Sequence, residues 1–83
     1  MGKMNEKFLA IRNRLVDKIN EFELKPALIE ASGTSRNTVN ETLKVNYENE
    51  LVGKKLVVWN TALKLIEERQ NLLSKSEKIL NEG

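Results

Sequence analysis

Length, composition and charge narrow the class of protein before any motif is considered. The chain has 83 residues with neither cysteine nor histidine, and 14 basic against 12 acidic residues give a formal net charge of +2. These absences exclude a disulfide framework, a thiolate metal site and histidine-based catalysis, so we expect no enzyme, no cofactor and no metal site. No apolar run is longer than four residues, the length of Leu56 to Trp59, which is too short for a membrane span. No export signal is indicated at the N-terminus, and we expect a cytoplasmic protein with no small-molecule ligand.

The positive charge is unevenly distributed along the chain. Residues 3–18 hold five basic and two acidic side chains, a local charge of +3, whereas residues 56–83 are neutral. A chain of this size buries only about 60% of its unfolded surface, so its core is small and a second subunit would add stability. We therefore expect a homodimer.

The first segment has the apolar spacing of a helix. Its apolar residues recur every three or four positions, which places them on one face: Met4, Phe8, Ile11, Leu15, Ile19 and Phe22. This predicts a helix over about 5–20. Lys7, Arg14 and Lys18 fall on a separate face, which is either simply solvated or contacts a nucleic-acid backbone.

Two short helices are predicted next, over 25–32 and 35–44. Pro26 suits the first turn of a helix because the N–H it lacks has no partner there. Gly33 suits a helix C-terminus because glycine adopts the left-handed conformation without a Cβ penalty. Ser35 is a candidate N-cap for the helix that carries Val39 and Leu43 at an i, i+4 spacing.

The last part of the chain predicts a loop and a long helix. Residues 45–50 are polar and typical of a turn. A helix is expected over about 53–70, and residues 71–82 either continue it or form a short further helix. Two apolar rows make its hydrophobic face wide: Leu56, Trp59, Leu63, Ile66, Leu73 and Leu80 in one, and Val58, Ala62, Leu65, Leu72 and Ile79 in the other. The fold class predicted is all-α, a single domain of four to five helices over 1–83 with a central helix-turn-helix and a long C-terminal helix.

Residues 26–43 resemble a known DNA-binding motif. Ser32 and Gly33 at the turn, Ser35 at the start of the second helix and Val39 on its inner face resemble the helix-turn-helix of phage-repressor-like (lambda-repressor-like) bacterial regulators. Leu28 fits a core position of the same motif. One helix before the motif and one or two after it are also part of that family's plan.

Three positions depart from the family pattern. Ile29 stands where alanine is usual because the two helices cross closely there, Thr34 where valine is frequent, and Thr42 where an aliphatic residue is usual. Each departure is expected to widen the crossing of the two helices. A plain helical hairpin in a small bundle is the alternative interpretation of the segment.

The resemblance implies sequence-specific binding of double-stranded DNA by a transcriptional regulator, with helix 35–44 in the major groove. The candidates for base contacts are the polar residues of that helix: Ser35, Arg36, Asn37, Asn40, Glu41 and Lys44. Arginine pairs with guanine, asparagine with adenine, and glutamate accepts from cytosine. The candidates for phosphate contacts are the flanking residues Lys25, Thr38, Asn46, Tyr47, Lys54 and Lys55.

The wide C-terminal apolar face allows two further expectations. Helix-turn-helix regulators pair on DNA half-sites, and this face offers a surface for pairing. The dimer-interface candidates are Trp59, Leu63, Ile66, Leu73 and Leu80. The monomer core is the alternative location for Trp59 and Leu63. The alternative function is a helical protein-interaction module or accessory protein that uses the apolar face of residues 56–80.

Overall fold

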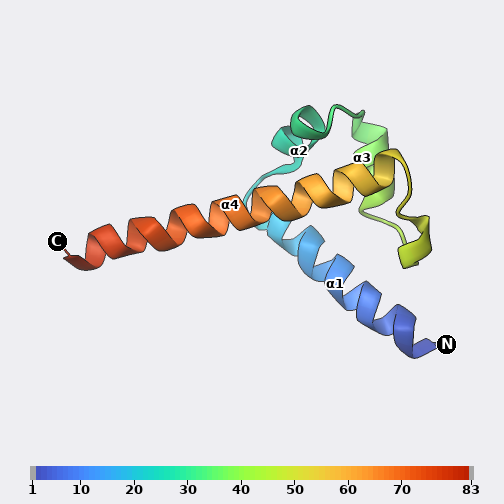
Figure 1. Ribbon diagram of the computed structural model, residues 1–83, viewed down its shortest axis with the longest axis horizontal. Coiled ribbons are helices and arrows are strands. Elements are labelled where there is room, and N and C mark those ends of the chain that lie inside the picture. The colour runs from blue at the N-terminus through green and yellow to red at the C-terminus, as the bar shows by residue number, and fades with distance from the viewer. Residues whose placement is uncertain (1, 83) are drawn as a thin grey trace.

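The computed structural model describes the backbone of residues 2–82 and the side chains of residues 6–81. Within that range the chain is all-α, with the helices α1 (Gly2–Glu21), α2 (Lys25–Ser32), α3 (Arg36–Thr42) and α4 (Lys54–Glu82) and the short 3₁₀ helix η1 (Glu48–Glu50). Helices α2 and α3 lie over the N-terminal half of α4, and α1 diverges from α4 toward the N-terminus (Figure 1). Beyond the point where α1 and α4 meet, α4 extends away from the other helices (Figure 1).

The predicted helix α1 is confirmed and is longer than expected. It runs over Gly2–Glu21 rather than 5–20. The side chains of Phe8, Leu15 and Ile19 are buried in the core, as their spacing predicts, but Ile11 remains 47% exposed. Met4, the first residue of the predicted apolar row, lies outside the described side chains.

Helix α2 has the predicted bounds. Leu24 precedes it with no side-chain cap, and Pro26 lies in its first turn, where the missing N–H leaves no hydrogen bond unmade. The helix ends at Gly33, whose φ of 68° is in the left-handed region and whose N–H donates to the Glu30 carbonyl.

Helix α3 is two residues shorter at its C-terminus than predicted. Ser35 is its N-cap, with Oγ accepting from the Thr38 N–H at 3.2 Å, which confirms that assignment. After Thr42 the chain tightens, because the N–H groups of Lys44 and Val45 bond three residues back rather than four. This turn directs Val45 into the core and leaves Lys44 outside the helix, which corrects the predicted end at 44.

The long helix α4 is continuous from Lys54 to Glu82, which decides between the two predicted forms of residues 71–82. At about 1.5 Å per residue its 29 residues span roughly 43 Å. The core packs only against its first half: Val58, Trp59, Ala62 and Ile66 are buried, and Leu65 packs against them at the edge of the cluster.

Thr42 is the one buried polar residue among those described. Its side chain is fully buried and its Oγ1 donates to the Thr38 carbonyl at 2.7 Å, so no polar atom of this side chain is left without a partner. The departure from an aliphatic residue at this position is therefore accommodated by a hydrogen bond within α3.

Candidate nucleic-acid interface

The turn between α2 and α3 is held by its own hydroxyl groups. Ser32 Oγ lies 2.8 Å from Thr34 Oγ1 and 3.3 Å from the Ile29 carbonyl. Ser35 Oγ binds both the backbone N–H and the hydroxyl of Thr38 across the first turn of α3. Thr34, which differs from the family pattern, thus contributes a hydrogen bond to the turn, and Ile29 is half-buried against the core.

One side of α3 packs inward and fixes how the other side is presented. Val39 and Thr42 are fully buried, and they anchor the helix against the neighbouring helix α4. Asn37 and Glu41 are exposed on the opposite side, and Arg36 is exposed at the N-terminal end of the helix. Arg36 and Asn37 belong to the first turn, next to the N-cap, so the N-terminal end of α3 carries most of this polar surface.

Most predicted base-contact residues have side chains that are uncommitted within the chain. Among the residues that the structure describes, no hydrogen bond or ion pair engages the side chains of Arg36, Asn37, Asn40, Glu41 and Lys44. Asn40 is only half-exposed, and Lys44 lies in the turn after α3. Ser35 is exposed, but its hydroxyl already caps the helix.

The loop after α3 is anchored to α1 by Arg12. The Arg12 guanidinium donates through Nη1 to the Val45 carbonyl at 3.1 Å and to Asn46 Oδ1 at 3.0 Å, and through Nη2 to Asn13 Oδ1 at 2.8 Å. Arg12 thus joins α1 to a segment more than thirty residues away in the sequence. In the sequence Arg12 is only one of the five basic residues of the positively charged segment 3–18.

The same loop is closed by Glu50. Its carboxylate accepts from the backbone N–H groups of Asn46 and Tyr47 at 2.9 and 3.0 Å. These two hydrogen bonds, followed by the attraction of Lys55, outweigh slight desolvation and lower the pKa of Glu50 below its ordinary value.

The Glu50 carboxylate changes the interpretation of two predicted phosphate contacts. The backbone amides of Asn46 and Tyr47 already bind an internal anion, and the Asn46 side chain binds Arg12. Tyr47 keeps a side chain that is 51% exposed. Asn46 is therefore committed to the loop, whereas the Tyr47 ring remains accessible.

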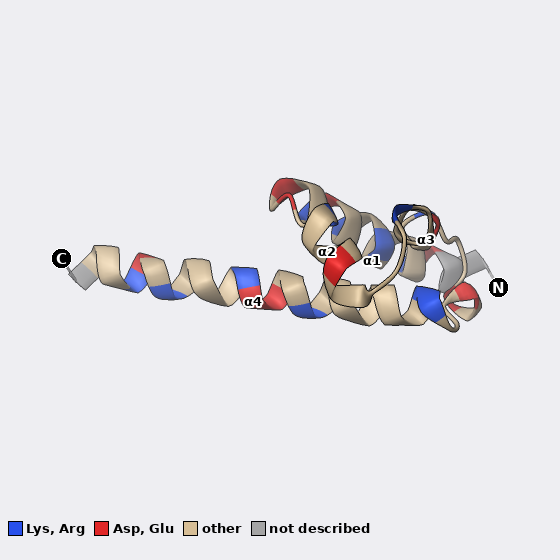
Figure 2. Cartoon of the chain, turned by 90° about the horizontal axis from the view of Figure 1, so that it is seen from above, with Lys and Arg blue, Asp and Glu red and all other residues tan. Residues whose placement is uncertain are grey.

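The other predicted phosphate contacts are dispersed. Lys25 is half-buried at the first residue of α2, Lys54 is exposed at the first residue of α4, and Lys55 is half-buried beside Glu50. Thr38 is engaged with Ser35. Figure 2 shows that basic and acidic residues are interspersed along the helices, so a field attracting DNA would come from a few local groups.

The dimer-interface candidates separate into two groups. Trp59 and Ile66 are buried in the monomer core, with 7% and 9% of their surface exposed, so their assignment to a dimer surface is corrected. They face inward because α1 and α2 cover this part of α4. Leu63, Leu73 and Leu80 are exposed.

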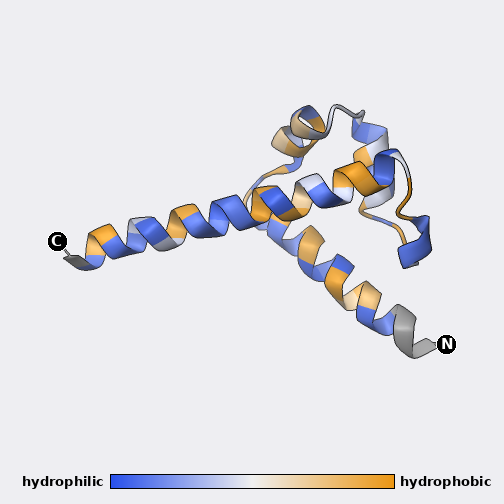
Figure 3. Cartoon of the chain, in the orientation of Figure 1, coloured by the Kyte–Doolittle hydropathy of each residue, from blue (hydrophilic) through white to orange (hydrophobic). Residues whose placement is uncertain are grey.

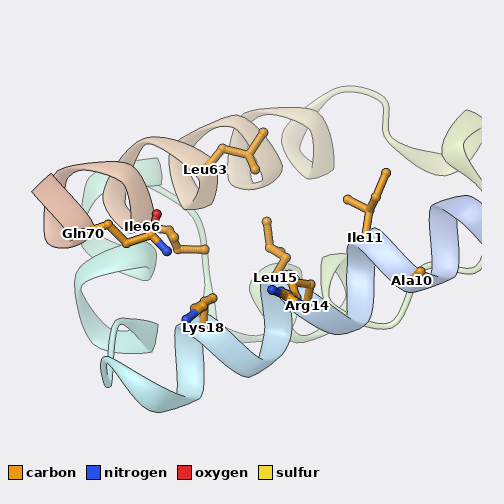
Figure 4. Close-up of a pocket in the computed structure, with 8 residues that line it drawn as sticks. All are labelled: Ala10, Ile11, Arg14, Leu15, Lys18, Leu63, Ile66 and Gln70. Carbon is orange, nitrogen blue, oxygen red and sulfur yellow. The ribbon is translucent and has the colours of Figure 1, made fainter.

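An open apolar groove of about 510 Å³ lies between α1 and α4. Figure 4 shows the two helices on opposite sides of it, with the residues Ala10, Ile11, Arg14, Leu15 and Lys18 from α1 and Leu63, Ile66 and Gln70 from α4. The exposed fractions of Ile11 and Leu63 are explained by this groove. The sequence pattern alone places both residues on apolar helix faces and does not show that the two helices diverge.

Comparison of the chain with protein-family models, with curated proteins and with solved structures finds no match. Within the described residues, no helix is both long enough and apolar enough to traverse a bilayer. Acidic side chains in the same part of the chain do not gather into a group of three or more that would hold a metal ion.

Two residues that hold the loop in place, Arg12 and Glu50, have no recognisable signal in the sequence. Arg12 lies at an ordinary helix position, and Glu50 is one of two glutamates in a polar turn. Their roles depend on α1 and the loop being adjacent, which no local spacing indicates. Only the i, i+3 and i, i+4 spacings of Glu50 from Tyr47 and Asn46 are compatible in retrospect with a capped turn.

Proposed function

We propose that this chain is a sequence-specific DNA-binding protein that reads the major groove with α3 and acts as a transcriptional regulator. The observation that supports this most directly is the exposed surface of α3, where Arg36 in the first turn and Asn37 and Glu41 on the outer side are unengaged, while Val39 and Thr42 hold the helix in place. A three-residue turn with a left-handed Gly33 joins this helix to α2. This is the arrangement with which two short helices present the second to a duplex.

The side chains on this surface have distinct hydrogen-bonding capacities. Arg36 can donate two parallel hydrogen bonds to O6 and N7 of guanine, and Asn37 can pair in bidentate fashion with adenine. Glu41 accepts only, which suits the amino group of cytosine. Asn40 and Lys44 lie at the edge of the surface, where Lys44 also suits a phosphate.

Phosphate contacts are proposed from the flanking cations and the exposed tyrosine. Lys25 lies at the start of α2, Lys54 at the start of α4, and Tyr47 in the loop between α3 and α4. Contacts of this kind fix orientation and contribute salt-dependent affinity without sequence information.

We also propose that DNA is bound by a homodimer. A single small module buries only about 600–1,000 Å² on DNA, less than most specific complexes. The exposed residues Leu63, Leu73 and Leu80 offer apolar surface for a second copy.

The test is selection of bound sites from random-sequence duplexes, followed by titrations at two salt concentrations. The proposal predicts an enriched site and a specific affinity that Arg36→Ala lowers by about 1–3 kcal/mol, with relaxed preference at one base pair. Lys64→Ala is the matched control, because Lys64 is an exposed cation on α4 rather than on α3. Absence of any enriched sequence, with uniform loss of binding in salt, would refute direct readout.

The second candidate function is a helical protein-interaction module, which the apolar groove between α1 and α4 favours. The same selection separates the two functions. A chain that retains no duplex at low salt but is folded by circular dichroism would favour this second function.

A further inference from the structure

The groove between α1 and α4 leaves apolar side chains of both helices uncovered. Its lining residues Leu15 and Ile66 are buried and extend into the space between the two helices (Figure 4). Ile11 of α1 and Leu63 of α4 are 47% and 45% exposed, and neither belongs to the core cluster. Apolar bands are visible on both helices in the region where they diverge (Figure 3). A continuous apolar hollow of this kind is typical of binding sites.

The α1 side of the groove is cationic. Arg14 and Lys18 line it one helical turn apart, and none of its described lining residues is acidic. Lys18 forms an exposed ion pair with Glu21 at 3.2 Å, and such pairs contribute little in water. Arg14 is exposed, and within the described part of the chain its side chain makes no hydrogen bond or ion pair. Arg14 is therefore the cation that is available to a partner.

The third cation of this row on α1 lies at the opposite end of the helix. Lys7 and Glu48 line an adjoining hollow of about 280 Å³ that also contains Ile11. Glu48 balances the charge of Lys7 at this end. The unbalanced positive charge therefore lies beside Arg14 and Lys18, next to the apolar groove.

The length of the groove matches two turns of a helix. On α1 its lining runs from Ala10 to Lys18, and on α4 from Leu63 to Gln70. At about 1.5 Å per residue these segments span roughly 12 and 10 Å. A partner helix covers the same length with apolar residues at i, i+4 and i+7, which is the spacing of helices that bind in grooves.

From the apolar lining, the length and the cationic side we propose that this groove binds an amphipathic helix of a partner protein whose flank is acidic. The apolar row of that helix covers Ile11 and Leu63, and an aspartate or glutamate beside the row pairs with Arg14. The inference rests on the second candidate function, for which it names the partner, and not on DNA binding by α3.

A second copy of this chain fits the groove less well than an acidic helix does. The exposed apolar residues at the end of α4 are accompanied by two basic and two acidic side chains, so residues 71–82 are neutral. Such a helix brings no net negative charge to Arg14, whereas an acidic flank does. The proposed homodimer retains Leu73 and Leu80, which do not line the groove.

The test is selection of partner helices by the intact chain from a displayed peptide library. The library holds helices of about 16 residues, long enough to form in water, with apolar residues fixed at i, i+4 and i+7 and all other positions randomised. The proposal predicts that aspartate and glutamate are enriched over lysine and arginine beside the apolar row. Enrichment of basic or uncharged flanks, or of no sequence at all, would overturn it.

Substitutions in the groove locate the binding site of the enriched peptide. Leu63→Gln and Ile11→Gln should each weaken its affinity about ten-fold, because an apolar contact is lost. Leu72→Gln is the control, since Leu72 is an exposed leucine of α4 outside the groove. Arg14→Glu should weaken binding about 3- to 10-fold at low salt and less at high salt, whereas Lys75→Glu should not. Circular dichroism verifies that each variant is folded.

The other possible occupants give different results. Equal effects of Leu63→Gln and Leu72→Gln would place the peptide outside the groove and contradict the inference. A dimeric parent chain that Leu63→Gln converts to a monomer, with no peptide enriched, would show that a second copy fills the groove instead.

The same variants separate this inference from the proposed DNA binding. Arg36→Ala should leave peptide affinity unchanged, because Arg36 is on α3 and does not line the groove. Absence of an enriched duplex with intact peptide binding would refute only DNA binding. An enriched duplex without any enriched peptide would refute only the acidic partner helix.

Discussion

Phe8 of α1 and Trp59 of α4 stack with their ring centroids 5.3 Å apart and an interplanar angle of 19°. Both rings are buried, and they join the two helices in the region where the helix axes diverge. Just after the end of α1, Phe22 lies beneath two cations, Lys18 of α1 and Arg69 of α4, at 5.5 and 5.9 Å from the ring centroid. Aromatic contacts thus hold α1 against α4 on both sides of the groove.

The stacked pair predicts a large loss of stability on truncation. Trp59→Ala should lower the free energy of unfolding by about 3–5 kcal/mol, because it leaves a large cavity between α1 and α4. Phe8→Leu should lower it by about 0.5–1.5 kcal/mol through loss of the stacking contact. Urea unfolding monitored by circular dichroism measures both. The exposed neighbour Val57 is the control, and a Trp59→Ala effect no larger than that of Val57→Ala would show that the stack is not a core contact.

The hydrogen bonds of Arg12 predict that a substitution that preserves its charge still lowers the stability of the fold. Arg12→Lys keeps the charge but not the planar fork that reaches both the Val45 carbonyl and Asn46 Oδ1. We expect both Arg12→Lys and Arg12→Ala to destabilise the fold by about 1–3 kcal/mol. Arg14→Ala, one cation further along α1 and exposed, should change stability by less than about 0.5 kcal/mol. Faster amide exchange in residues 43–47 of the Arg12 variants would locate the effect, and unchanged exchange there would contradict it.

The hydrogen bonds of the Glu50 carboxylate predict how the free energy of unfolding changes with pH. Because the pKa of Glu50 is lowered in the folded chain, its hydrogen bonds contribute stability above the ordinary pKa of 4.5. That contribution is lost as the pH falls through the lowered value. The difference in unfolding free energy between the parent chain and Glu50→Ala should therefore be largest near pH 7 and disappear in strong acid.

Glu48→Ala is the matched control for Glu50, because the Glu48 side chain makes no hydrogen bond among the described residues. Unfolding of both variants is measured by urea titration at several pH values, together with exchange of the Asn46 and Tyr47 amides. If Glu48→Ala and Glu50→Ala show the same pH profile, the capped loop does not form in solution.

The turn between α2 and α3 predicts that substituting Gly33 lowers the stability of the fold through backbone conformation alone, without a steric clash. No atom lies within 4 Å of a Cβ built there, yet its φ of 68° is unfavourable for a side chain. Gly33→Ala should destabilise the fold by about 1–2 kcal/mol, and Gly33→Asn by less, because asparagine tolerates the left-handed region. Thermal unfolding compares the two variants. Equal stability of Gly33→Ala and the parent chain would indicate a different turn.

The local structure of this protein follows from short-range features of the sequence. Pro26, Gly33 and Ser35 act within a few residues of themselves, so the bounds of α2 and the start of α3 follow from backbone geometry and capping alone. The apolar spacing of α1 and α4 likewise shows which positions share a helix face. The outer side of α3 could be predicted in the same way, because Asn37 and Glu41 lie two positions before and after Val39 and therefore on the opposite side of the helix.

How much of each apolar face is covered depends on the packing of the helices against one another. Trp59 and Leu73 belong to one apolar row in the sequence, yet only the first is buried, since α1 and α2 reach only half the length of α4. The shortened end of α3 also depends on the turn that carries Val45 into the core. The hydrogen bond of Arg12 to the Val45 carbonyl forms only when two segments distant in the sequence pack together. Whether a side chain is buried depends on this packing and not on the spacing of residues within one helix.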